Sequence, residues 1–290
     1  MYKTEGHSLL NLNNRNIFTE KAFYFKIYIN YTGKEIKMST IIHDFRETIN
    51  GLFAQIEQEQ TAFEKAAKVI ADAFEADRMV HVIGPGGHSN MGVEEILWRA
   101  GGLAIWDAIL DPGTNLIHGA KRSNIVERTP GYAKAVLDAY HVGAKPGEVM
   151  VIINAYGINS MTIDTVLECR KRGVTTIAVT SDSFAKIVPQ GHQSRHPSGK
   201  NLFEEADIYI NNHLPVGDAV IAIEGYDQKV GSTSTFCNCF CMNCLSASVV
   251  QEFVKREIEP PVFVSANMPG GDEHNKALEE KYGKLVKHLL

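Results

Sequence analysis

Short β-rich apolar runs alternate along this chain with segments of helical periodicity, and this alternation constrains the fold more than any other feature. Strands are predicted over residues 79–83, 103–106, 149–153, 174–179 and 208–210. Helices are predicted over residues 91–100, 131–140, 160–171, 235–257 and 276–288. Because strands separated by helices form parallel βαβ units, the sequence predicts an α/β fold: a doubly wound, five-stranded parallel sheet flanked by helices.

A long amphipathic helix is predicted ahead of the first strand, over about residues 40–76. Apolar residues recur there in steps of three and four, the spacing of one helix face: Ile42, Phe45, Ile49, Leu52, Phe53, Ile56, Phe63, Ala66, Ala67, Ile70, Ala73 and Phe74. A stripe of this length needs a partner along its whole face. Since most soluble oligomers are symmetric, we expect a second copy of the chain there, in a homodimer or homotetramer.

Residues 1–37 differ from the rest of the chain. They hold six lysines and arginines but three glutamates, and the asparagine-rich residues 11–16 follow neither a helical nor a strand period. Met38 is followed by Ser39 and Thr40, a pattern typical of a start and a helix cap. We therefore predict that residues 1–37 are a dispensable extension and that residues 38–290 form a single domain with a C-terminal helical arm. The alternative is an added edge strand over residues 22–31.

The composition argues against several classes of protein. A net charge of -5 at pH 7 gives no overall attraction to nucleic acid or to an anionic membrane, so neither is an expected partner. No apolar run resembles a signal peptide or a membrane span. The five cysteines are an odd number without an export signal, which favours a reducing, cytoplasmic location over a disulfide framework.

Four of the cysteines cluster at Cys237, Cys239, Cys241 and Cys244, a spacing similar to that of a metal site. On a helix, however, Cys237, Cys241 and Cys244 share one face while Cys239 points elsewhere. Free cysteines behave as small buried hydrophobic residues. We therefore expect these thiols to pack in the core, and we expect neither a bound metal nor another cofactor.

The first predicted strand ends in a glycine-rich loop, Gly84-Pro85-Gly86-Gly87-His88-Ser89-Asn90. Ligands of open α/β sheets bind at the carboxyl ends of the strands, where glycines let backbone N–H groups approach an anion. A tight turn with a helix cap explains the loop equally well. A third interpretation is a dinucleotide site of an NAD(P)-dependent oxidoreductase, with Gly84, Gly86 and Asp107, although Ser89 replaces the third glycine of that fingerprint.

The loop and its continuation, Gly84-x-Gly86-Gly87-His88-Ser89-Asn90-Met91-Gly92 and Glu94-Glu95-x-x-x-Arg99-Ala100-Gly101-Gly102, resemble the first ligand loop of SIS (sugar isomerase) domains. The likeness extends through Leu110-Asp111-Pro112, Glu127-Arg128, His196-Pro197-Ser198-Gly199-Lys200 and Gly270-Gly271-Asp272-Glu273-His274-Asn275. Together these motifs resemble bacterial phosphosugar-binding SIS proteins related to phosphoheptose isomerases, over residues 38–290. The resemblance implies a flavodoxin-like SIS fold, a dimer or tetramer, and a phosphorylated sugar or amino sugar as the ligand.

SIS proteins carry a second, serine-rich phosphate cradle after the third strand, and this sequence departs from it. Here the segment is Ile153-Asn154-Ala155-Tyr156-Gly157-Ile158-Asn159-Ser160, with Asn154 and Tyr156 where serines are expected. Asn159 and Ser160 still present donors at a helix N-terminus. The ligand-binding residues implied by the whole resemblance are Gly86, Gly87, Ser89, Asn90, Asn154, Asn159, Ser160, Thr180, Ser181, Ser198, Lys200 and His274.

Aldose–ketose isomerisation needs a base that moves a proton between adjacent carbons. The resemblance makes Glu95 the candidate base, with His88 and His196 as candidate acid–base partners. Glu95 is equally compatible with a helix-surface ion pair to Arg99, four residues on. The sequence therefore leaves three functions open: a sugar phosphate isomerase, a non-catalytic phosphosugar sensor, or, with less support, the oxidoreductase.

Overall fold

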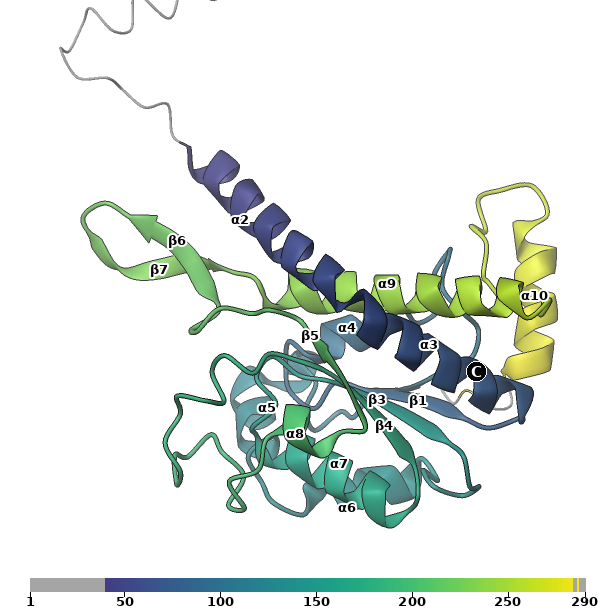
Figure 1. Cartoon of the computed structure of the whole chain (residues 1–290), viewed down its shortest axis with the longest axis horizontal. Helices are drawn as coiled ribbons and strands as arrows, with labels where there is room; N and C mark the ends of the chain where they lie inside the picture. Colours follow the sequence, from purple (N-terminus) through teal and green to yellow (C-terminus); the bar gives the residue numbers. More distant parts are fainter. Residues whose placement is uncertain (1–39, 284–285, 287–290) are drawn as a thin grey trace, which may run out of the picture. The chain divides into compact units, whose positions relative to one another are not determined.

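A parallel sheet of five strands lies at the centre of the computed structural model, which describes residues 40–283 and 286 (Figure 1). Its strands are β1 (Val80–Ile83), β2 (Trp106–Ile109), β3 (Val149–Ile153), β4 (Thr175–Thr180) and β5 (Ile208–Asn211). The strand order is β2-β1-β3-β4-β5, and every neighbouring pair is parallel. The predicted doubly wound, five-stranded α/β fold is confirmed.

Helices connect the strands and cover both faces of the sheet. Those before β3 are α2 (Ile41–Ile56), η1 (Glu57–Glu59), α3 (Gln60–Glu75), α4 (Asn90–Glu94), η2 (Leu116–His118), α5 (Ala120–Val126) and α6 (Tyr132–Ala139). Those after it are α7 (Ser160–Lys171), α8 (Leu202–Glu205), α9 (Ser234–Lys255) and α10 (Gly271–Tyr282). Residues 45–283 belong to one compact unit, and residues 41–44 at the start of α2 belong to another.

Alternate residues of each strand enter two separate cores, because successive side chains of a strand point to opposite faces. Val149, Val151 and Ile153 of β3 pack with α3, α4 and α9. Met150 and Ile152 pack with α6 and α7 on the other face. Figure 1 shows the same division, with α3 and α9 on one side of the sheet and α6, α7 and α8 on the other.

The apolar stripe of the long N-terminal helix is covered largely by α9 of the same chain. Phe53 stacks on Phe240 with ring centroids 4.1 Å apart, and Phe74 contacts Phe253 at 4.8 Å. Ile56, Ala66 and Ile70 are fully buried, among other residues of this stripe. The stripe from residue 49 onward therefore does not need a second copy of the chain to cover it, which was the reason for predicting an oligomer.

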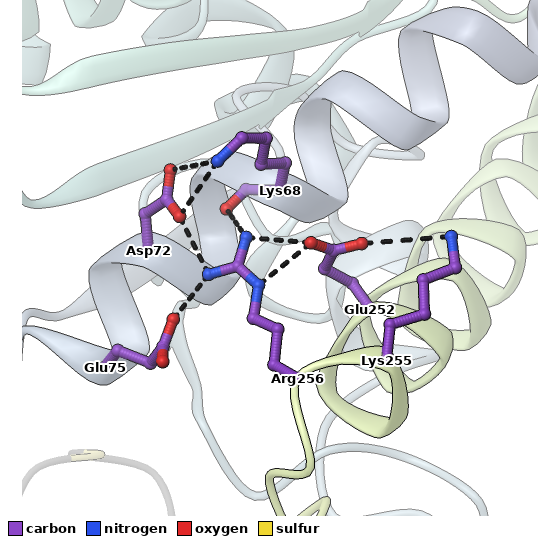
Figure 2. Close-up of polar contacts among 6 residues, drawn as sticks. All are labelled: Lys68, Asp72, Glu75, Glu252, Lys255 and Arg256. Atoms are coloured by element: carbon purple, nitrogen blue, oxygen red, sulfur yellow. Dashed lines mark hydrogen bonds and ion pairs between the residues drawn. The ribbon is translucent and has the colours of Figure 1, made fainter.

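An ionic cluster joins the ends of α3 and α9 (Figure 2). The Arg256 guanidinium binds Asp72 at 2.8 Å, Glu75 at 2.5 Å and Glu252 at 2.8 Å. Lys68 binds Asp72 at 3.3 Å from the opposite side. Although slight burial opposes it, the hydrogen bonds from Arg256 and Lys68 lower the pKa of Asp72. The cluster therefore links α3 to α9, two helices that cover the same face of the sheet.

The structure differs from the sequence predictions in several local elements. The second strand lies at Trp106–Ile109 instead of 103–106, because the polar Asp107 is buried inside it against β1. The helix predicted over 91–100 is α4, which ends at Glu94, and Trp98 then adopts a left-handed conformation with φ 50°. The residues before α9 form an antiparallel hairpin, β6 (Ala219–Ile223) and β7 (Tyr226–Ser232), that the sequence did not reveal.

The cysteine cluster lies on α9, where Cys237 and Cys241 are fully buried in the core and Cys239 and Cys244 are half-buried. Burial raises the pKa of the Cys237 thiol to about 12, so the side chain stays protonated and apolar. No helix in the described part of the chain is long and apolar enough to cross a membrane. The predicted extension of residues 1–37, with its alternative edge strand at 22–31, lies outside the described residues.

Candidate functional site

A cavity of about 560 Å³ lies where β1 and β3 end, between the loops that follow these strands. Small-molecule sites in proteins typically occupy 300–1,000 Å³. The first loop supplies Gly86, Gly87, His88 and Ser89, and the second supplies residues 154–156, 158 and 159. The remaining lining residues are Leu116, Ala120, Ser123, Asn124, Glu127, Arg128, Phe184, His192, Ser194, Asp218 and Ser234.

The first loop can follow its path only because it is built from glycines. A Cβ at Gly84 would collide with the backbone carbonyl of Ser89, so the turn closes on itself too tightly for any side chain. A Cβ at Gly86 would lie 2.8 Å from Glu127 Oε2. The backbone of the loop therefore forms one wall of the cavity, with a carboxylate directly against it.

Glu127 follows α5 and was not predicted as a site residue. It is half-buried, and the Gly87 N–H donates a hydrogen bond to its carboxylate. Burial raises the pKa of Glu127, because desolvation outweighs both the positive charge of Arg128 and the Gly87 hydrogen bond. A carboxyl group whose pKa is shifted toward neutrality is suited to exchanging protons with a ligand. The one sequence signal for it is that Glu127-Arg128 is among the motifs shared with SIS proteins.

The second loop is held against the first by two asparagines. Asn154 Nδ2 donates to the Pro85 carbonyl at 3.0 Å, and Asn159 Nδ2 donates to the same oxygen at 2.9 Å. Asn159 Oδ1 also accepts from the Thr162 N–H at 2.8 Å, which caps α7. The polar side chains of the second loop therefore organise the cavity wall.

The long connection between β4 and α8 forms a further wall. The ring of Phe184 packs against that of Tyr156 in a tilted arrangement, with ring centroids 4.5 Å apart, and His192 Nδ1 lies 2.7 Å from Ser194 Oγ. Arg195 is buried and donates to the Ala185 carbonyl at 2.9 Å, which fixes the fold of this connection. A cavity enclosed by three segments that are distant in sequence can surround a small ligand.

Comparisons with known proteins agree with this architecture. The SIS domain family matches residues 44–181. A UPF0309 protein of Caldanaerobacter subterraneus is 37% identical over 248 residues, which cover 83% of this chain and 98% of the relative. This chain belongs to the UPF0309 family. A second UPF0309 relative, from Brucella canis, is 36% identical over 245 residues and covers 84% of this chain and 97% of its own. The SIS resemblance of the sequence is confirmed.

Two solved structures show weaker similarity to this UPF0309 protein. A phosphoheptose isomerase from Francisella tularensis has a TM-score of 0.42 at 15% identity, and the match covers 74% of this chain and 100% of the isomerase chain. The sugar isomerase domain of an RpiR transcription factor from Sphaerobacter thermophilus has a TM-score of 0.42 at 14% identity, covering 85% and 99%. The fold assignment therefore relies on the strand order and the family match.

The structure brings eight of the fifteen predicted site residues of this SIS domain to or beside the cavity. Gly86, Gly87, His88, Ser89, Asn154 and Asn159 line it. Asn90 supports the first loop from behind, because its side-chain amide donates to the Gly86 carbonyl at 3.0 Å. Ser160 is buried at the start of α7. Their roles in binding stay predictions.

The other predicted residues lie outside the cavity lining. Glu95 binds Arg99 at 2.8 Å and accepts from Asn243 Nδ2 at 2.9 Å. His196 lies 3.1 Å from Asp164 and 2.6 Å from Ser198. The partners of the remaining residues are the Leu214 carbonyl for Ser181, Glu205 for Lys200 and the Val262 carbonyl for His274, whereas the Thr180 hydroxyl is buried without a partner in the described part of the chain.

The dinucleotide interpretation required Asp107 at the cavity, next to the ribose of a bound cofactor. Asp107 lies instead inside β2, opposite His81 of β1, and is almost completely buried. Its Oδ2 lies 2.7 Å from His81 Nδ1. Asp107 is therefore part of the interior of the sheet.

Proposed function

We propose that this UPF0309 protein binds a phosphorylated sugar or amino sugar in the cavity at the carboxyl ends of β1 and β3. The observation that carries the proposal is the composition of the cavity wall: a glycine loop, three amide side chains, a carboxyl group with a raised pKa and a guanidinium, around about 560 Å³. Such a site matches a ligand with several hydroxyl groups and one anionic group. The SIS-domain match at residues 44–181 supports the same ligand class.

We further propose that the bound sugar is isomerised between its aldose and ketose forms. Glu127 removes the proton from carbon 2 of the aldose while protonated His88 gives a proton to the oxygen on carbon 1, which forms an enediol. His88 then takes the proton of the oxygen on carbon 2, and Glu127 returns its own proton to carbon 1, which yields the ketose. Both residues line the same cavity.

In this proposal Glu127 has the role that the sequence suggested for Glu95. Glu127 lies at the cavity wall against Gly86, whereas Glu95 is held by Arg99 and Asn243 on the surface of α4 and α9. A general base must reach the proton that it abstracts. Two carboxylate side chains line the cavity, those of Glu127 and Asp218. Both oxygens of Asp218 accept hydrogen bonds at the N-terminus of α9, whereas the pKa of Glu127 is raised, so Glu127 is the better acid–base group.

A thermal-shift screen tests the binding proposal, because a ligand that binds only the native state raises its melting temperature. Hexose, heptose and amino-sugar phosphates are compared with their unphosphorylated forms. We expect one phosphorylated sugar to raise Tm by several degrees and its unphosphorylated form to have a smaller effect. If no phosphorylated sugar stabilises the protein, the proposal is wrong.

Turnover of the stabilising sugar then separates an enzyme from a sensor. Glu127→Gln should lower the isomerisation rate about 100-fold or more while leaving sugar binding measurable. Glu95→Gln is the matched control, and its rate should stay close to that of the native protein. Binding without turnover by the native protein would identify a non-catalytic phosphosugar sensor instead.

We also propose that the protein acts as a cytoplasmic homo-oligomer. All five cysteines are free, which suits a reducing compartment. The β6–β7 hairpin favours an oligomer. Every residue of β7 is exposed, and a two-stranded hairpin without further partners is only marginally stable in water, so we expect a second copy of the chain to cover it. Light scattering that shows a monomer at micromolar concentration would contradict the oligomer.

A further inference from the structure

In the second loop of the cavity, the backbone N–H groups that could bind an anion are already hydrogen-bonded within the chain. Asn154 Oδ1 accepts from the backbone N–H of Tyr156 at 3.2 Å and from that of Gly157 at 2.9 Å. Successive N–H groups of this kind form the concave anion sites of phosphate-binding loops. A phosphate bound here would have to displace the Asn154 side chain, which is buried and also anchored to Pro85.

The N–H groups at the N-terminus of the following helix, α7, are also hydrogen-bonded within the chain. Asn159 Oδ1 accepts from the Thr162 N–H at 2.8 Å, and the Glu127 carbonyl accepts from the Met161 N–H at 3.0 Å. An anion at a helix N-terminus is held by such unpaired N–H groups. Since two of them are bound within the chain, the N-terminus of α7 is a poor phosphate site.

The N-terminus of α9 reaches the cavity too, and a carboxylate already occupies it. Asp218 Oδ1 accepts from the Thr233 N–H at 2.8 Å and the Ser234 N–H at 2.7 Å, and Oδ2 accepts from the Ser234 hydroxyl at 2.8 Å. The negative charge of Asp218 repels a second anion at short range. Phosphate is therefore excluded from this wall as well.

Arg128 differs from these groups because it carries a positive charge and a donor without a partner in the described part of the chain. It lines the cavity, and among the described lining residues it is the only lysine or arginine. Its Nε is buried and has no hydrogen-bond partner in the part of the chain that the structure describes. Burying a donor of a charged group without a partner is costly, and a guanidinium can bind a phosphate through two parallel N–H groups.

We propose that Arg128 is the phosphate subsite of this cavity, and that the second loop, serine-rich in other SIS proteins, contacts only the uncharged part of the sugar here. This inference rests on the proposed function, since it locates the phosphate of that ligand. It explains the replacement of two expected serines by Asn154 and Tyr156. The Asn154 side chain binds the N–H groups of the second loop, and the phosphate binds instead to Arg128 at a different wall of the cavity. Glu127, the neighbour of Arg128, then faces the sugar carbons.

Calorimetric titration of three proteins tests the subsite. The native protein, Arg128→Met and Lys121→Met are titrated with the stabilising sugar phosphate and with the same sugar lacking phosphate. Lys121 is exposed on α5 and outside the cavity lining, so its variant removes the same charge without touching the cavity. We expect Arg128→Met to weaken the phosphorylated sugar about 10- to 100-fold and the unphosphorylated sugar hardly at all, and Lys121→Met to bind both as the native protein does.

A second variant covers the case in which Arg128→Met fails to fold. Arg128→Lys keeps the charge but loses the forked geometry, so phosphorylated sugar should bind with intermediate affinity. Unchanged affinity of every folded Arg128 variant would overturn the subsite and leave the proposed function standing. If the native protein does not distinguish phosphorylated from unphosphorylated sugars, the proposed function fails, and the subsite with it.

Discussion

The two ends of the sheet hold their ionisable side chains in different surroundings. Near the amino ends of the strands, His81 is enclosed by carboxylates: Nδ1 lies 2.7 Å from Asp107 and Nε2 lies 3.3 Å from Glu148. Glu148 also accepts from the N–H groups of Gly143 at 2.6 Å and Lys145 at 3.0 Å. We name His81, Asp107 and Glu148 the amino-end cluster. All three side chains are almost completely buried.

At the carboxyl end, around the cavity, buried polar atoms remain without partners. Arg128 Nε and Asn90 Oδ1 have none in the described part of the chain. The pKa of the half-buried Glu127 is raised by its burial, whereas the hydrogen bonds of Glu148 lower the pKa of that carboxyl group despite burial. On this comparison we expect the amino end to contribute stability and the carboxyl end, where we propose the ligand site, to contribute less.

The largest expected effect is at the amino-end cluster. Although burial opposes it, the hydrogen bonds with Asp107 and Glu148 raise the pKa of His81, which favours the charged form of the ring between the two carboxylates. His81→Leu leaves both carboxylates buried without the hydrogen-bond partner that they share, and we expect it to lower the free energy of unfolding by about 3–5 kcal/mol. Urea unfolding measures the loss. His118→Leu, at an exposed histidine, should cost less than about 0.5 kcal/mol.

A loss below about 1 kcal/mol for His81→Leu would contradict the comparison. It would mean that the cluster is no more important for stability than an average surface contact, and that the two ends of the sheet do not differ.

A smaller effect is expected at the first loop. Gly84→Ala places a Cβ against the Ser89 carbonyl, and because that atom belongs to the backbone, the loop must shift. We expect a loss of about 1–3 kcal/mol in urea unfolding, together with loss of sugar phosphate binding. Gly51→Ala is the matched control, since its Cβ meets open space in α2. It should stabilise the protein by about 0.5–1 kcal/mol. Normal binding by Gly84→Ala would show that the loop does not shape the cavity.

The smallest expected effect is a gain in stability at the cavity. A carboxyl group with a raised native pKa binds protons more tightly when folded, so the free energy of unfolding falls as pH rises from the ordinary pKa of Glu through the raised one. Glu127→Gln removes this penalty. We expect it to stabilise the protein by about 0.5–1 kcal/mol at pH 8 and hardly at all at pH 4. Destabilisation at pH 8 would mean that Glu127 is a structural group like Glu148.

The sequence predicted the elements whose boundaries are marked locally. The prediction for α7 was correct to the residue, because Asn159 caps its start and Gly173 follows its last turn. β2 was misplaced by three residues at its start, since an aspartate inside a buried strand is explained only by His81 on the neighbouring strand. Long-range partners of this kind leave no periodic signal in a single sequence.

The sequence predicted only part of the cavity, because some of its residues are brought there by long-range contacts. The glycine loop and the asparagines directly follow strands, so sheet topology brought them together as expected. Glu127 and Arg128 reach the cavity from the end of α5, a helix that was not predicted from the sequence. Glu95 and His196 bind neighbouring residues instead of lining the cavity, and the spacing of residues in the sequence does not show which of these two arrangements forms.

Hydrogen–deuterium exchange with and without a stabilising sugar phosphate tests the central claim, that the two ends of the sheet have different tasks, most directly. We expect bound ligand to slow exchange in residues 84–90 and 123–128, at the carboxyl end. Residues 141–148, next to the amino-end cluster, should exchange at the same rate in both states. Protection of residues 141–148 without protection of the first loop would contradict the account.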